Sequence, residues 1–173
     1  EAGGLRLGLA TPTDVISAFE DIKNSVSSFD STAVIDGIGV YEMVTDAVEL
    51  IAGVKRDPVF GAVVLVGSGG VLVEMLEDAV VRIAPVTKSD AYDMIAELKV
   101  FPLLEGARGH SKSDIDAVAD VLVRLSDFSL ATDLVSEVDI NPLMVLPKGE
   151  GACAADSLIS MNVAKKGSTN TSV

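Results

Sequence analysis

The chain has 173 residues, 49% apolar but only 4% aromatic, so Val, Leu, Ile and Ala must fill the core of one compact domain or two small subdomains. Its 26 acidic and 13 basic residues give a net charge of −13, which argues against a nucleic-acid partner but fits a metal–nucleotide complex. The single cysteine excludes an internal disulfide, and the apolar runs are too short to cross a membrane, so the sequence predicts a cytoplasmic protein without a membrane partner.

The first predicted element is a helix from about Pro12 to Ser27. Thr11 is a hydroxyl cap, Pro12 occupies the first helical position and Asp14 places an acid in the first turn. Three strands are then predicted in succession, over Ile38–Val44, Val48–Val54 and Ala62–Val66. Strands that follow one another directly predict a mainly antiparallel sheet.

The middle of the chain is predicted to hold a second hairpin and two helices. The hairpin comprises Val71–Leu76 and Ala79–Ile83, and it follows the glycine-rich turn 67–70. That turn could bring backbone N–H groups to a phosphate, but an ordinary turn is the more frequent meaning of such a run. The helices are predicted from Lys88 to Leu98 and from a capping box at 113–116 to about Ser129.

The C-terminal third returns to a strand pattern, over Ser136–Ile140, Leu143–Leu146 and Ala152–Ser157. The turn 147–150 joins the last two of these strands. The order of elements predicts an α+β fold with a mostly antiparallel sheet flanked by helices. Residues 161–173 are predicted to be a disordered tail, since they have little apolar surface to bury.

Asp139-Ile140-Asn141-Pro142 is the segment that most clearly indicates chemistry. Alternation along a strand places Asp139 and Asn141 on one face. Asn141 and Asp156 are equidistant from the centre of the turn 147–150, so a regular hairpin sets them opposite each other. Two carboxylates and an amide are hard oxygen ligands that suit Mg²⁺. An isolated D-x-N-P is more often only a turn with solvated acids, and the hairpin register is what favours a metal site.

Residues 49–61, with the sequence ELIAGVKRDPVFG, resemble the signature strand and turn of the ATP-grasp domain in NDP-forming acyl-CoA synthetases. The resemblance continues through 66–74, 82–85, 103–109 and 137–143, and it covers nearly the whole chain from Gly3 to Ile159. It implies that residues 1–160 are an ATP-grasp nucleotide-binding subdomain that lacks the first subdomain. His110, the only histidine, does not match the phosphorylated histidines of this family and is predicted to lie at the surface.

The resemblance also implies a reaction and a set of ligands. Acyl-CoA, ADP and phosphate would be interconverted with carboxylate, CoA and ATP through a phosphohistidine, with CoA-binding and phosphohistidine domains as partners. Asp139, Asn141 and Asp156 would hold Mg²⁺, and Glu42-Met43-Val44 resembles the hinge strand that reads adenine, although an ordinary core strand explains it equally well. For Arg56 and Arg82 a phosphate contact and a structural ion pair both remain open.

One departure from the family affects the expected activity. Relatives carry a His-Lys-Ser stretch, whose Lys contacts nucleotide phosphate, just before the residues that match Gly3-Gly4. Because phosphoryl transfer depends on positioning and charge neutralisation, the chain alone is predicted to be inactive. Two alternatives are a ligand-binding regulatory module of a protein lysine acetyltransferase fusion and an assembly module with exposed strand edges.

Overall fold

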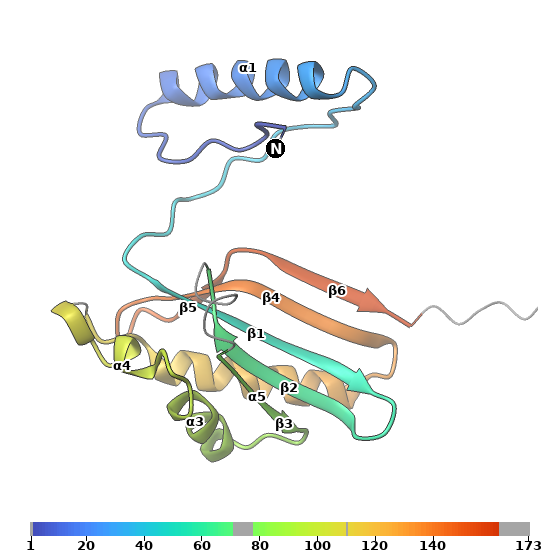
Figure 1. The fold of residues 1–173 in the computed structure, drawn as a ribbon, viewed down its shortest axis with the longest axis vertical. Helices are drawn as coiled ribbons and strands as arrows, with labels where there is room; N and C mark the ends of the chain where they lie inside the picture. Colours follow the sequence, from blue (N-terminus) through green and yellow to red (C-terminus); the bar gives the residue numbers. More distant parts are fainter. Residues whose placement is uncertain (1, 71–77, 110, 163–173) are drawn as a thin grey trace, which may run out of the picture. The chain divides into compact units, whose positions relative to one another are not determined.

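A computed structural model of the protein describes residues 2–70, 78–109 and 111–162. The chain divides into two compact units, Glu1–Thr45 and Asp46–Val173, which are described separately. Figure 1 labels their helices and strands. Among the described residues, no helix is long and apolar enough to cross a membrane.

The first unit contains one helix, α1 (Pro12–Phe29), which begins as predicted. Thr11 and Asp14 form a reciprocal capping box, in which the Thr11 hydroxyl accepts from the Asp14 N–H at 3.2 Å and the Asp14 carboxylate accepts from the Thr11 N–H at 2.8 Å. Ala18 and Ile22 are buried on the inner side of the helix. The helix extends two residues beyond the predicted end.

The predicted strand at 38–44 is not formed. This segment is extended but has no secondary structure, and Tyr41 and Met43 are 90% and 53% exposed. Its apolar residues resemble a strand in sequence, but a strand forms only against a neighbouring strand, and the described residues provide none for it. This prediction was therefore wrong.

The second unit is an antiparallel sheet in the order β3-β2-β1-β4-β5, with β6 also paired to β4 (Figure 1). All its described strand pairs are antiparallel, as predicted. The strands are β1 (Val48–Asp57), β2 (Gly61–Ser68), β3 (Ala79–Ile83), β4 (Val135–Val145), β5 (Ala152–Ala154) and β6 (Ser157–Met161). The predicted partner of Ala79–Ile83 in a second hairpin, Val71–Leu76, lies outside the described residues, and β3 pairs with β2.

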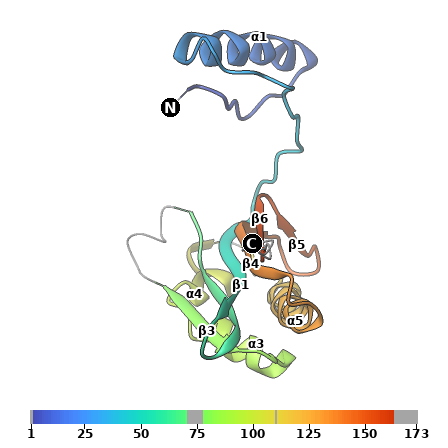
Figure 2. The same cartoon turned by 90° about the vertical axis from the view of Figure 1, so that its right-hand side faces the viewer.

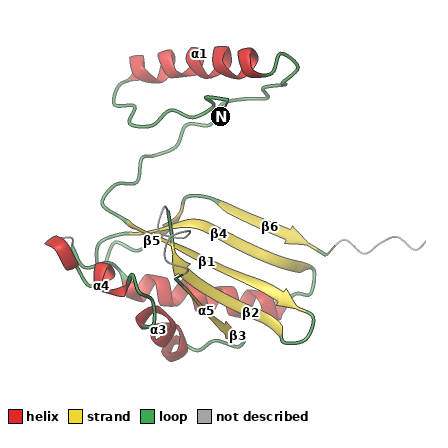
Figure 3. Cartoon of the chain, in the orientation of Figure 1, coloured by secondary structure: helices red, strands yellow, loops and turns green. Residues whose placement is uncertain are grey.

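Helices cover one face of this sheet (Figure 3). They are α3 (Lys88–Ala96), α4 (Phe101–Leu104), a short 3₁₀ helix (Ala107–Gly109) and α5 (Ile115–Ala131). Figure 2 shows α5 end on, beside the sheet. The core lies between sheet and helices, with Leu122 of α5, Met94 of α3 and Val64 of β2 fully buried in it.

The α5 helix begins one residue later than the predicted box implied. Asp114, rather than Ser113, is the cap, and its carboxylate accepts from the Ala117 N–H at 3.1 Å. Ser113 instead forms an isolated bridge with Pro147 of the β4–β5 turn.

The two predicted strands at 136–140 and 143–146 are one long strand, β4, because a bulge allows the chain to continue through Asn141-Pro142. The predicted tail at 161–173 lies outside the described residues from position 163 onward, and Met161 still belongs to β6.

Candidate functional site

The side of the sheet away from α3 and α5 carries the candidate site, and we call it the open face. On β1, Ala52 and Val54 are buried in the core, so Gly53 and Lys55 lie on the open face. The pairing register extends this assignment across the sheet. One row contains Val63, Lys55, Glu137 and Ser160, and the next contains Leu65, Gly53, Asp139 and Leu158.

The predicted pairing of Asn141 with Asp156 is present. The Asn141 N–H donates to the Asp156 carbonyl at 3.1 Å. On either side, Leu143 pairs with Ala154 and Ile140 pairs with Ser157, so from Glu137 to Val145 the β4 strand keeps one register against β6 and β5. The hairpin geometry expected from the sequence is therefore confirmed.

A bulge keeps the polar residues of β4 out of the core. Leu50 pairs with Leu143 and Ala52 pairs with Ile140, so Ile51 faces the two residues Asn141 and Pro142. The extra residue shifts the alternation, which allows β4 to bury Val138 on one side of the bulge and Leu143 on the other. Asp139 and Asn141 both remain exposed.

The side chains of Asp139, Asn141 and Asp156 are of the chemical types that Mg²⁺ prefers as ligands. Asp156 is also exposed, and its Oδ1 accepts from the Ser157 N–H at 2.8 Å, which leaves Oδ2 available. Among the described residues, no hydrogen bond or ion pair engages the side chains of Asp139 or Asn141. Two carboxylates and an amide oxygen match the ligands that Mg²⁺ shares with nucleotide phosphates and water. The same part of the chain holds no cluster of three or more His, Cys, Asp or Glu side chains placed around a metal, so a site here requires the amide.

A depression of about 360 Å³ lies beside Asp139 on the open face. Its walls include Leu65 and Val81 on one side and Lys55 and Asp139 on the other. Gly53 forms part of its floor, where an added Cβ would lie 2.6 Å from the backbone oxygen of Val138. Glycine is therefore required at position 53 by the close approach of β1 and β4, and the missing side chain leaves the depression open.

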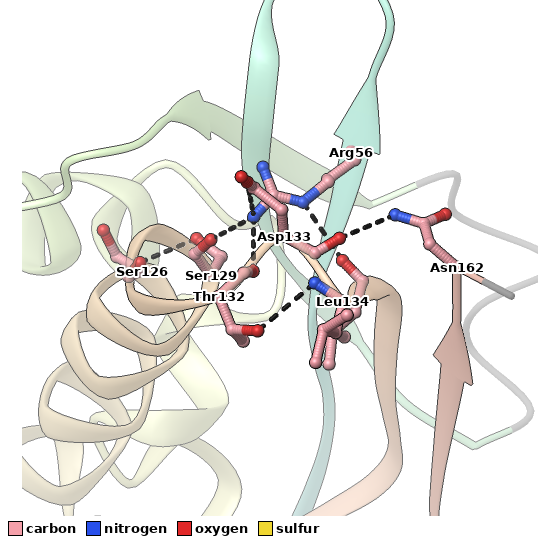
Figure 4. Close-up of polar contacts among 8 residues, drawn as sticks. Arg56, Ser126, Ser129, Thr132, Asp133, Leu134 and Asn162 are labelled. Carbon is pink, nitrogen blue, oxygen red and sulfur yellow. Dashed lines mark hydrogen bonds and ion pairs between the residues drawn. The ribbon is translucent and has the colours of Figure 1, made fainter. Parts of the chain in front are cut away.

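The Arg56 side chain is bonded to the end of α5 (Figure 4), although Arg56 is also among the residues that line the depression. Its guanidinium donates to the carbonyls of Thr132 at 2.6 Å, Val135 at 3.1 Å and Ser129, and it pairs with the Asp133 carboxylate at 3.1 Å. Ser129 and Thr132 are at the C-terminal end of α5, where free carbonyls attract a cation. The structure therefore gives Arg56 the structural role, one of the two that the sequence left open.

Arg82 is also directed away from the open face. It pairs in register with Val64, whose side chain is in the core, and its guanidinium contacts the Glu97 carboxylate at the end of α3. The guanidinium groups of both predicted arginines thus have partners other than Asp139 and Asn141. The predicted adenine-reading segment, Glu42-Met43-Val44, belongs to the other compact unit, and its contact with nucleotide stays a prediction.

Two residues near the site were not singled out from the sequence. Lys55 lies on the open face, which strand alternation could have shown once the register was known. Asp114 is buried, and its carboxylate accepts from the N–H groups of Gly149 at 3.0 Å and Gly151 at 2.9 Å. The sequence predicts Asp114 only as part of a capping box, because its contact with the β4–β5 turn joins positions far apart in the chain.

Asp57 illustrates how the signature turn is built. Its Oδ1 accepts from the N–H groups of Val59 at 2.7 Å and Phe60 at 2.9 Å. These two donors hold the pKa of the Asp57 carboxyl below its usual value, with Phe60 contributing most. Asp57 therefore stabilises the β1–β2 turn at the edge of the depression.

Comparison with known proteins identifies relatives for most of the chain. Residues 1–161 match the sequence model of a family described as an ATP-grasp domain. The acetate–CoA ligase (ADP-forming) I of Archaeoglobus fulgidus is 42% identical over 149 residues, which are 86% of this chain and 22% of that protein. The β subunit of the acetate–CoA ligase (ADP-forming) I of Pyrococcus furiosus is 36% identical over 157 residues, which are 91% of this chain and 67% of that subunit.

The fold also resembles a solved structure, that of the dinucleotide-forming acetyl-coenzyme A synthetase 1 of Ca. Korarchaeum cryptofilum. In its complex with coenzyme A, Ca-AMPCP and HgCl⁺, it matches with a TM-score of 0.84 and 37% identity, over 93% of this chain and 69% of that one. The chain thus spans about a fifth of the first of these relatives and about two thirds of the other two.

Proposed function

Because this chain belongs to the ATP-grasp domain family, we propose that it is the Mg–nucleotide-binding part of an ADP-forming acyl-CoA synthetase. The complete enzyme would interconvert acyl-CoA, ADP and phosphate with a carboxylate, CoA and ATP by way of a phosphohistidine. The relatives support this choice over a regulatory module, since they are named as ADP-forming acid–CoA ligases. The nature of the acyl group would be set by other parts of the enzyme.

The observation that carries the proposal is the register of β4, which sets Asn141 opposite Asp156 and keeps Asp139 on the same face. These residues would hold Mg²⁺, and a bound Mg²⁺ neutralises phosphate charge and fixes the orientation of the phosphate chain. The Ca. Korarchaeum cryptofilum synthetase has also been solved in complex with Mg-AMPPCP, which agrees with this use of the fold. The oxygen ligands are exposed and need no rearrangement of the core to receive the ion.

The open face offers the surface for the nucleotide itself. The apolar side chains of Leu65 and Val81 border the depression, and Asp139 lies on its polar side. A site with apolar walls and a few polar groups at one end is the usual design for a small ligand.

Partners are expected because the chain covers only part of its relatives. CoA-binding and phosphohistidine domains would be supplied in the same polypeptide, as the length of the Archaeoglobus fulgidus ligase suggests, or by another subunit, as the name of the Pyrococcus furiosus β subunit suggests. In the Mg-AMPPCP complex of the Ca. Korarchaeum cryptofilum synthetase, a phosphohistidine segment points towards the nucleotide-binding site. A corresponding segment would have to reach the phosphates held near Asp139.

The test is a calorimetric titration of Mg-ADP into the complete gene product that carries this chain, as wild type and as Asn141→Ala. We expect the variant to bind Mg-ADP at least about tenfold more weakly, which corresponds to about 1.4 kcal/mol. Without Mg²⁺, the two proteins should bind ADP equally weakly, because the amide acts through the metal.

The matched control is Asn162→Ala, which removes an amide bonded to the Asp133 carbonyl at 2.9 Å, at the other end of the β4–β6 pair. This variant should keep its affinity for Mg-ADP. If the wild-type protein does not bind Mg-ADP, the nucleotide assignment fails. If Asn141→Ala binds as tightly as wild type, the nucleotide assignment stands but the metal hairpin does not.

A further inference from the structure

Lys55 is the one cation that the strand register places on the open face within the described part of the sheet. It lies across from Glu137, and the neighbouring row pairs Gly53 with Asp139. Its side chain is 71% exposed and lines the same depression as Asp139. A positive charge therefore lies one row from Asp139, on a face where the described strands place no other basic side chain.

The bond that holds Lys55 is weak. Its Nζ lies 3.5 Å from Glu137 Oε1, beyond the usual length of a charge-assisted hydrogen bond, and the Glu137 side chain is 40% exposed. Ion pairs in water are worth about 0–1 kcal/mol, since solvent screens them and both side chains lose freedom. A phosphate group carries more charge and more acceptor oxygens than a single carboxylate, so it can replace Glu137 as the partner of Lys55.

The guanidinium groups of Arg56 and Arg82 are already engaged by other partners. The Arg56 guanidinium donates hydrogen bonds to carbonyls at the end of α5 and at the start of β4, and it pairs with Asp133. Arg82 pairs with Glu97 on the helix side of the sheet. Gly53 leaves the space between Leu65 and Asp139, in the row next to Lys55, free of an intervening side chain. The ammonium group of Lys55 thus has an open path to a ligand in the depression.

We propose that Lys55 binds a phosphate group of the nucleotide on the open face and that Glu137 holds the ammonium in place until the phosphate arrives. This inference rests on the proposed function and identifies a residue of the same site. Lys55 would neutralise phosphate charge from the side of β1, while the metal ligands act from β4. Its contribution should therefore depend on the presence of phosphate and not on the adenosine part.

The experiment compares wild type, Lys55→Ala and Lys55→Arg in the complete gene product, with Mg-ADP, adenosine and inorganic phosphate as separate ligands. We expect Lys55→Ala to bind Mg-ADP about tenfold more weakly and adenosine equally well, and Lys55→Arg to recover most of the affinity. Glu137→Gln should bind Mg-ADP as tightly as wild type or more tightly, because it removes the competing carboxylate. The matched control is Lys112→Ala, another exposed lysine, whose Nζ pairs with Glu105 at 2.9 Å away from the open face.

The outcomes separate this inference from the proposed function. If wild type binds Mg-ADP but Lys55→Ala binds it equally well, the inference about Lys55 is wrong and the nucleotide site stands. If Lys55→Ala weakens Mg-ADP and adenosine to the same extent, its effect is on the structure of the site and the phosphate contact is refuted. If inorganic phosphate alone binds with a dependence on Lys55 while Mg-ADP does not, the anion at this position is free phosphate, and the inference fails in the form given.

Discussion

Asp114 shows how one buried side chain positions the candidate metal ligands. Its carboxylate caps α5 through the Ala117 N–H and holds the β4–β5 turn through Gly149 and Gly151. Both glycines have φ near 90°, a conformation that side chains rarely adopt, so the turn needs this external support. That turn sets the register of Asn141 against Asp156. Asp114 therefore helps to position these two residues on the open face, although it caps a helix that covers the other face of the sheet.

We predict that Asp114→Ala lowers the free energy of unfolding by about 2–3 kcal/mol, since three backbone donors lose a charged acceptor in a buried place. Chemical denaturation of the two proteins measures this difference. Asp127→Ala is the control, because Asp127 is an exposed acid on the same helix, and its change should stay within about 0.5 kcal/mol. Equal stability of wild type and Asp114→Ala would show that the turn does not depend on the carboxylate.

The same carboxylate predicts a pH dependence. Burial alone would raise the pKa of Asp114, but the N–H donors of Gly151, Ala117 and Gly149 together lower it below its ordinary value of 3.8. A pKa that is lower in the folded state means that the ionised form stabilises the fold above pH 3.8, and that this contribution is lost as the pH falls through the folded pKa. The difference in free energy of unfolding between wild type and Asp114→Asn should therefore become smaller below pH 3.8. If this difference stays constant down to the pH of acid unfolding, the ionised Asp114 carboxylate does not stabilise the fold.

The sequence predicted the elements of the second unit well where local rules decide them. Alternation and the turn at 147–150 were sufficient to set Asn141 against Asp156, because a hairpin register depends only on residues close in the chain. The strand at 38–44 failed for the opposite reason, since its pairing needs a neighbour that no local pattern can supply. The contacts of Arg56 with the end of α5 likewise join positions more than 70 residues apart, so they could not be read from spacing.

Arg56 connects three elements, β1, α5 and β4, and its replacement should destabilise the contacts among all three. Its guanidinium joins β1 to the last carbonyls of α5 and to the first residue of β4, Val135. We predict that Arg56→Lys lowers the free energy of unfolding by about 1–3 kcal/mol, because an ammonium cannot reproduce the planar set of donors. Hydrogen exchange should show faster exchange at the end of α5 and at the start of β4.

Arg82→Lys is the matched control for this prediction. Arg82 makes an exposed ion pair with Glu97, so its replacement should cost at most about 1 kcal/mol. If Arg56→Lys is as stable as Arg82→Lys, the contacts at the end of α5 contribute little. Unchanged Mg-ADP binding in folded Arg56→Lys would agree with a structural role, whereas a selective loss of binding would restore the phosphate contact that the sequence left open.

At the scale of the whole molecule, the net charge of −13 is the dominant electrostatic feature. Acidic side chains outnumber basic ones two to one, so we expect repulsion between acids to exceed the attraction in surface pairs such as Lys88–Asp120, whose charged atoms are 2.7 Å apart. Such repulsion destabilises the compact state. Salt largely screens charges that lie more than a Debye length apart, which is about 10 Å at 0.1 M, so it weakens the long-range repulsion between acids more than it weakens a pair in direct contact.

We therefore predict that the melting temperature rises as NaCl is increased from low to moderate concentration, by about 2–4 °C for each kcal/mol of repulsion that is screened. KCl should act equally, because screening depends on ionic strength and not on the identity of the cation. Lys112→Glu, which adds negative charge and breaks the pair with Glu105, should melt at a lower temperature in low salt and gain more from added salt than wild type. If the melting temperature falls as salt is added, the surface ion pairs stabilise the protein more than the repulsion destabilises it. The excess of acidic residues would then not lower the stability of the folded chain.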